Sequence, residues 1–144
     1  MNGVVRYVAW LLTLCASVGL GCTKNENENS LAKHQSSHVR ILANLHALAT
    51  TKLGHVPRDA QEFKQAITKL GVNLENRKVG SIDELFISER DGQPLVVAYG
   101  TTNLESDVVV YEQTGVNGKR LVGHRIGMVE EVDEAELKKL TASK

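Results

Sequence analysis

The sequence is poor in cysteine, proline and aromatic residues, and it has no excess of charge of either sign. Of its 144 residues, two are cysteines and two are prolines, and 17 basic residues balance 17 acidic ones. A balanced charge provides no electrostatic footprint for nucleic acid. Both cysteines, Cys15 and Cys22, lie near the N-terminus, so the chain beyond them has neither a disulfide framework nor a thiol nucleophile. These absences favour one ordinary globular domain that does not bind nucleic acid.

The first 21 residues have the layout of a bacterial signal peptide. Arg6 is their only charged residue, the run 8–20 is apolar, and small residues come directly before Cys22. The apolar run is shorter than the about 20 residues that a helix needs to cross a bilayer. We therefore expect residues 1–21 to be a signal peptide and the chain to be exported.

The end of this leader carries a motif for lipid attachment. Val18-Gly19-Leu20-Gly21-Cys22 resembles the lipobox of bacterial lipoproteins. The resemblance implies that a diacylglycerol group is attached to the thiol of Cys22 and that the chain is cut directly before it. The acyl chains would hold the protein at a membrane surface in the cell envelope, periplasmic or outer, since each buried CH₂ contributes about 0.8 kcal/mol. Gly19 and Gly21 also satisfy an ordinary signal peptidase, and a retained membrane anchor is the third alternative.

The leader is followed by a polar tether and then by a domain. Residues 22–29 alternate Asn and Glu after Lys24 and contain no apolar side chain beyond Cys22, so they predict a flexible segment. Folded structure is expected from about Ser30, which makes residues 30–144 a single globular domain. Residues 22–144, the chain without its leader, contain 16 basic and 17 acidic residues, which gives them a net charge of −1.

Helical periodicity is strongest between residues 31 and 53. Gly54 provides a C-terminal stop, and a capping box of Asp59 and Glu62 opens a second helix that ends at Gly71. The apolar positions of the first helix are Ile41, Leu42, Leu45, Leu48, Ala49 and Leu53.

From residue 81 onward the pattern predicts strands. Ser81 and Glu84 repeat the capping signature over about one turn. The runs 85–87 and 95–99 then flank Asp91-Gly92, which predicts a hairpin.

A second hairpin and a closing helix follow. The runs 108–111 and 120–122 flank Asn117-Gly118, and the run 126–132 continues the meander. Asp133 and Glu136 then cap a short C-terminal helix. Helices followed by about four antiparallel strands predict the α+β class.

The span 41–137 resembles the globular head of G-type pseudopilins of type II secretion and of planctomycete pilin-like proteins. The residues that carry the resemblance are Leu42, Leu45, Leu48, Gly54, Pro57, Phe63, Tyr111, Glu112, Gly118, Val122, Gly127, Val129 and Val132. Pseudopilins continue their N-terminal apolar helix into the first helix of the head, whereas this chain has a lipoprotein leader and a polar tether there. The resemblance therefore implies a pilin-like head that serves as an anchored lipoprotein.

Three histidines offer a candidate metal site. His34 and His38 are four residues apart on the predicted first helix, and His46 lies two turns further on. Zinc needs three or four ligands, and no glutamate lies between the pair as in the helical zinc-protease pattern. We expect no metal site and no cofactor.

One carboxylate and one imidazole offer a candidate acid/base pair. Strand alternation places Val108 and Val110 on the same face as Glu112, and His124 follows the partner strand. If this face is the core, Glu112 is a partly buried carboxylate whose partner is Arg120 or His124. We interpret Glu112 and His124 as a cross-strand polar pair that sets pairing and register.

The sequence therefore predicts a non-enzymatic, lipid-anchored envelope domain that contacts the membrane through its N-terminal lipid and binds an unidentified envelope protein. A pseudopilin-like accessory of a secretion system is one alternative. An enzyme of unknown reaction that uses Glu112 and His124 is the other.

Overall fold

The computed structural model describes residues 34, 36–100 and 106–142. The predicted signal peptide, Cys22 and the tether lie outside the described residues. The elements are α2 (His38–Leu53), α3 (Ala60–Lys69), the 3₁₀ turns η1 (Glu75–Arg77) and η2 (Glu84–Phe86), β1 (Leu95–Val97), β2 (Val108–Glu112), β3 (Lys119–His124), β4 (Val129–Asp133) and α4 (Glu134–Thr141). The strands form an antiparallel sheet in the order β1-β2-β3-β4. The predicted α+β class is confirmed.

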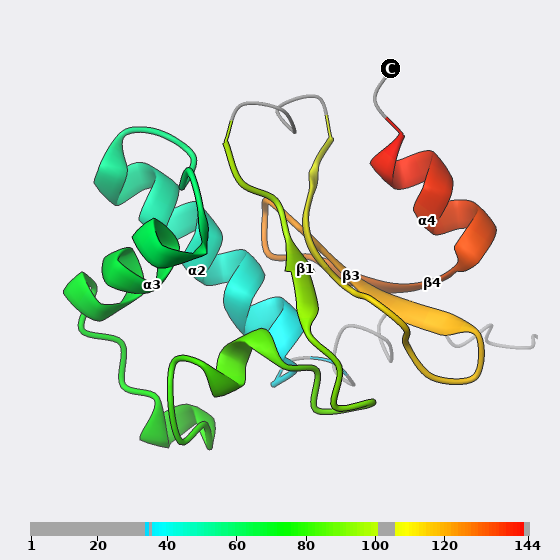
Figure 1. Cartoon of the computed structure of the whole chain (residues 1–144), viewed down its shortest axis with the longest axis horizontal. Helices are drawn as coiled ribbons and strands as arrows, with labels where there is room; N and C mark the ends of the chain where they lie inside the picture. Colours follow the sequence, from blue (N-terminus) through cyan, green and yellow to red (C-terminus); the bar gives the residue numbers. More distant parts are fainter. Residues whose placement is uncertain (1–33, 35, 101–105, 143–144) are drawn as a thin grey trace, which may run out of the picture.

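The sheet lies between two helical layers, with α2 and α3 on one side and α4 on the other (Figure 1). Each side has its own cluster of buried apolar residues. The larger cluster, under α2 and α3, includes Val39, Leu42, Leu45, Ala49, Phe63, Ile67, Leu85, Val110 and Leu121. The smaller cluster, under α4, consists of Val108, Val122, Val132 and Leu137, with Tyr111 and Leu140 at its edge. Both faces of the sheet are therefore covered.

Helix α2 starts later than its apolar pattern predicts. The side chain of Ser37 caps its first turn by accepting a hydrogen bond from the N–H of Arg40 at 3.3 Å, which fixes the start at His38. His34 consequently lies before the helix. Gly54 ends the helix in the left-handed conformation, with a φ of 75°, and donates its N–H to Thr50.

Of residues 85–87, predicted as a strand, Leu85 and Phe86 lie in the 3₁₀ turn η2, and only Ile87 is extended. Ser81 accepts the N–H of Glu84 at 3.2 Å, and Glu84 in turn accepts the N–H of Gly80 at 2.7 Å. This local capping winds η2 and turns Leu85 fully into the core. The predicted hairpin around Asp91-Gly92 is reduced to a turn with one bridge, between Ile87 and Pro94.

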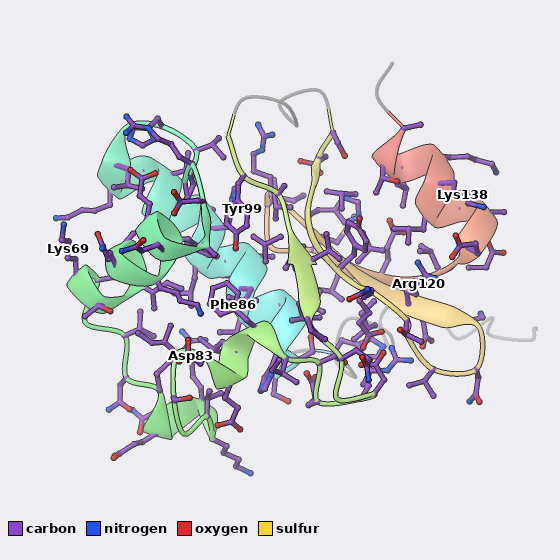
Figure 2. All side chains as sticks on the ribbon, viewed as in Figure 1. Lys69, Asp83, Phe86, Tyr99, Arg120 and Lys138 are labelled. Atoms are coloured by element: carbon purple, nitrogen blue, oxygen red, sulfur yellow. The ribbon has the colours of Figure 1, made fainter. Side chains whose placement is uncertain are left out.

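Aromatic rings join the helical layer to β1. The ring of Phe63 on α3 lies edge-on to Phe86 at 5.7 Å and to Tyr99 at 6.4 Å between centroids. Figure 2 shows Phe86 and Tyr99 between the helices and β1. Tyr99 follows β1 and is half-buried, so the end of this strand is held against the helices.

A bulge in β2 breaks the predicted strand alternation. Val108 lies opposite His124, but Val110 lies opposite Gly123, so the register shifts by one residue between them. Val109 and Val110 consequently both face the larger cluster, whereas Val108 faces α4. The prediction that Val108 shares a face with Val110 and Glu112 was wrong because alternation assumes an unbroken ladder.

The second hairpin and the C-terminal helix are confirmed. Asn117 and Gly118 have φ values of 54° and 73°, the left-handed pair that a tight two-residue hairpin turn requires. Asp133 accepts the N–H of Glu136 at 2.9 Å and opens α4 as predicted.

Gly123 allows α2 to approach the sheet, and its replacement by alanine should destabilise the fold. An added Cβ would lie 2.9 Å from Val110, 3.0 Å from Val39 and 3.1 Å from Ala43. We expect Gly123→Ala to lower the free energy of unfolding by about 1–3 kcal/mol, measured by urea denaturation. Gly80→Ala is the control, because its Cβ meets only the end of the Glu84 side chain. Equal effects of the two substitutions would contradict this packing.

Candidate functional site

A hollow of about 670 Å³ opens where the second half of α2 meets the α2–α3 connection and the β3–β4 turn. Its surface is mainly apolar, and its volume lies in the range of about 300–1,000 Å³ that is typical of small-molecule sites. The residues that line it are His46, Ala47, Thr50, Thr51, His55, Val56, Arg58, Gly100 and Arg125.

Backbone hydrogen bonds fix the walls of the hollow. Gly54 reverses the chain at the end of α2, so the residues that follow fold back beside the helix. Gly100 donates its N–H to Pro57 at 2.8 Å, which ties the end of the β1 segment to the α2–α3 connection. Arg125 donates its N–H to Asp107 at 2.8 Å and so positions the β3–β4 turn. The hollow is therefore built by three separate parts of the chain.

His46 provides the buried end of the hollow. Its side chain is 2% exposed, its Nε2 donates to the carbonyl oxygen of Ala98 at 3.0 Å, and its ring lies edge-on to Phe63 at 5.5 Å. Burial lowers the pKa of His46, the bond to Ala98 acts in the opposite direction, and the charge of Arg125 lowers the pKa further. The imidazole is consequently neutral near pH 7 with its proton on Nε2, which leaves Nδ1 as an acceptor with no partner among the described residues.

The exposed edge of the hollow is cationic. Arg58 and Arg125 are both exposed, and the Arg125 guanidinium donates to the carbonyl oxygen of Ser106 at 3.3 Å. His55 donates its Nδ1 hydrogen to Val56 at 2.9 Å. None of the described residues that line the hollow is acidic. The edge therefore favours an anion.

Two large apolar side chains next to lining residues in the sequence are exposed. Leu48, which follows Ala47 on α2, is 52% exposed, and Ile126, which follows Arg125, is 79% exposed. Neither of them lines the hollow.

Glu112 is almost fully buried, but its partners are not those predicted. Its carboxylate accepts from Ser88 Oγ at 2.7 Å and from the N–H of Leu121 at 2.8 Å, and it lies 3.5 Å from Arg90 Nη1. Arg90 Nη2 also donates to Glu131 at 2.7 Å. The carboxylate is therefore a structural group that is enclosed by donors.

The predicted pair of Glu112 and His124 does not form. His124 lies opposite Val108, four residues before Glu112 on β2, or roughly 13 Å along the strand. Its Nε2 lies 2.7 Å from Glu130, and its Nδ1 lies 3.3 Å from Asp107.

Arg120, the other predicted partner, pairs elsewhere as well. Its Nη2 lies 2.6 Å from Glu134 Oε2, on the side of the sheet that faces α4 (Figure 2). The partner predictions for Glu112 were wrong because they considered only the neighbouring strand.

The three histidines of the metal hypothesis are not gathered at one point. His34 precedes α2, His38 donates its Nδ1 hydrogen to Ile87 at 2.6 Å, and His46 donates to Ala98. Within residues 34, 36–100 and 106–142, no group of three or more histidine, cysteine or acidic side chains is placed to hold a metal ion. No helix in this same part of the chain is long and apolar enough to cross a membrane.

Sequence reasoning missed most of the hollow. His46 was considered only as a metal ligand, although an imidazole on the apolar face of a helix was a usable signal. The contributions of Arg58 and Arg125 depend on long-range folding, and nothing local in the sequence distinguishes them from other surface arginines.

Comparison with family models, with curated proteins and with solved structures found no match to this chain. The resemblance to a lipobox and to pseudopilin heads therefore stays a prediction.

Removal of the charge of Glu112 should destabilise the sheet. We expect Glu112→Gln to lower the free energy of unfolding by about 1–3 kcal/mol, because Ser88 and Leu121 would donate to a weaker acceptor in a buried site. Urea denaturation measures the loss. Glu134→Gln is the matched control, since Glu134 is 51% exposed and its pair with Arg120 contributes less than about 1 kcal/mol. If the control lost as much stability, Glu112 would not have the role described.

The neutral state of His46 should be visible in its titration. We expect its imidazole, followed by NMR, to titrate below the ordinary value of 6.5. The unfolded chain then binds more protons than the folded one as the pH falls from 6.5 toward the lowered value, so the free energy of unfolding declines across that window. His46→Phe should remove this part of the acid-side loss. A titration at or above 6.5 would contradict the described burial.

Proposed function

We propose that this protein is an exported, lipid-anchored domain of the bacterial cell envelope that binds a ligand and does not catalyse a reaction. The observation that carries the proposal is the hollow of about 670 Å³, whose lining is mainly apolar and includes the buried imidazole of His46 and the exposed side chains of Arg58 and Arg125. A concave, mainly apolar pocket with a few polar groups is the usual form of a small-molecule site.

A non-catalytic role is favoured by how the polar groups are used. Glu112 and His124, the predicted acid/base candidates, are each held by other partners. In the hollow itself, the hydroxyls of Thr50 and Thr51 donate to the carbonyl oxygens of His46 and Ala47. A hydroxyl nucleophile has to donate to a neighbouring base, and these two donate to the helix backbone instead.

The position of the predicted anchor suits this role. Ser37, the cap of α2, comes fifteen positions after Cys22. A fully extended chain of that length spans at most about 50 Å. A lipid on Cys22 would therefore keep the hollow close to the membrane surface.

The anchor is tested by the intact mass of protein that is extracted from its native membrane. We expect a chain that begins at Cys22 and carries a diacylglyceryl group, and we expect Cys22→Ser to lose both the added mass and the membrane association. An unlipidated wild-type chain in the soluble fraction would overturn the anchored part of the proposal.

The hollow is tested with Nile red, an uncharged apolar dye that fluoresces when it leaves water. We expect saturable binding at one site, and we expect Ala47→Trp to abolish it by filling the hollow. Lys52→Trp adds the same side chain to an exposed position of the same helix that does not line the hollow, and it should leave binding unchanged. Binding that survives Ala47→Trp would show that the hollow is not the site.

A further inference from the structure

We propose that the hollow selects an amphiphile with one negative charge, namely a carboxylate on an apolar chain, such as a long-chain fatty acid. The inference rests on the proposed function and adds the chemical class of its ligand. It follows from how polarity changes between the buried end of the hollow and its exposed edge.

The buried end is uncharged. His46 is 2% exposed and neutral near pH 7, and the surface around it is mainly apolar. A buried end of this kind accepts a hydrocarbon chain, because moving apolar surface out of water is favourable by roughly 25 cal/mol per Å². A charged group would lose its hydration there without finding a counter-charge.

The exposed edge carries two positive charges from separate parts of the chain. Arg58 belongs to the α2–α3 connection and Arg125 to the β3–β4 turn, and both line the hollow. Guanidinium groups suit carboxylates because they donate two parallel hydrogen bonds in a fixed geometry. The two arginines therefore favour a carboxylate at the edge with its chain directed inward.

Three carboxylates lie near this edge, but none of them lines the hollow. Asp59 accepts the N–H of Glu62 at 2.8 Å, and Glu62 accepts the N–H of Arg58 at 2.7 Å. Asp107 lies 3.3 Å from the imidazole of His124. Glu62 also lies 3.7 Å from Nε2 of His55, which lines the hollow. None of these three carboxylates is itself among the described residues that line the hollow, whereas Arg58 and Arg125 both are.

The experiment measures displacement of bound Nile red by three probes with the same twelve-carbon chain, namely dodecanoate, dodecanol and dodecyltrimethylammonium, each below its micelle concentration. It uses the mature chain with Cys22→Ser, which lacks the acyl chains and keeps every described residue. We expect dodecanoate to bind about tenfold more tightly than dodecanol, and the cationic probe not to compete.

The double variant Arg58→Gln/Arg125→Gln should weaken dodecanoate binding by about tenfold or more and leave dodecanol binding unchanged. Arg77→Gln is the control, because Arg77 is exposed on η1 and does not line the hollow.

Two results would overturn the inference. The first is that dodecanoate and dodecanol bind with equal affinity, or that the double variant binds dodecanoate as tightly as the wild type does. The hollow would then be an apolar site without charge selection. The second is that none of the three probes displaces Nile red. If Nile red itself did not bind, the proposed function would fail together with the inference, so the two failures are distinguishable.

Discussion

The arrangement of the strands depends on the buried carboxylate of Glu112. This group ends β2, accepts the N–H of Leu121 on β3, and accepts the hydroxyl of Ser88 from the segment between η2 and β1. It thereby joins three parts of the chain at one point, with Arg90 close by. A buried carboxylate is costly unless donors surround it, so any slip of the β2–β3 register would leave an unpaired charge in the core. The observed register is the one that keeps these donors in place.

With that register fixed, the sheet can be covered on both faces. The bulge near Val108 turns one valine toward α4 while Val109 and Val110 face α2, so both helical layers find apolar surface. Gly123 lets α2 lie close to the sheet at the point where Val39 and Ala43 pass it. The early turns of α2 are consequently used for packing on the strands. Its later turns carry His46 and Thr50 into the hollow.

The hollow combines a neutral buried end with a cationic edge, and this polarity gives it a direction. A ligand with an apolar chain and one anionic end has only one favourable orientation in it. In the reverse orientation the anionic end would be buried without a counter-charge, and the apolar chain would lie at the arginines. Such a site would suit the proposed anchoring at a membrane surface, where amphiphilic molecules are concentrated. A domain with no net excess of charge can present a local cationic edge of this kind, because its basic and acidic residues are unevenly distributed.

The sequence by itself determined the α+β class and the boundaries that depend on local hydrogen bonds. It also predicts an export signal, which lies outside the described residues. The caps at Asp59 and Asp133 and the turn at Asn117-Gly118 were predicted correctly, because each bond or conformation involves residues no more than three positions apart. Only the tertiary structure decided the partners of Glu112 and the walls of the hollow. Ser88 is 24 residues from Glu112, and the hollow joins residues 46–58 to residues 100 and 125. Such contacts depend on how helices and strands pack in space, and the local pattern of side chains carries no record of that packing.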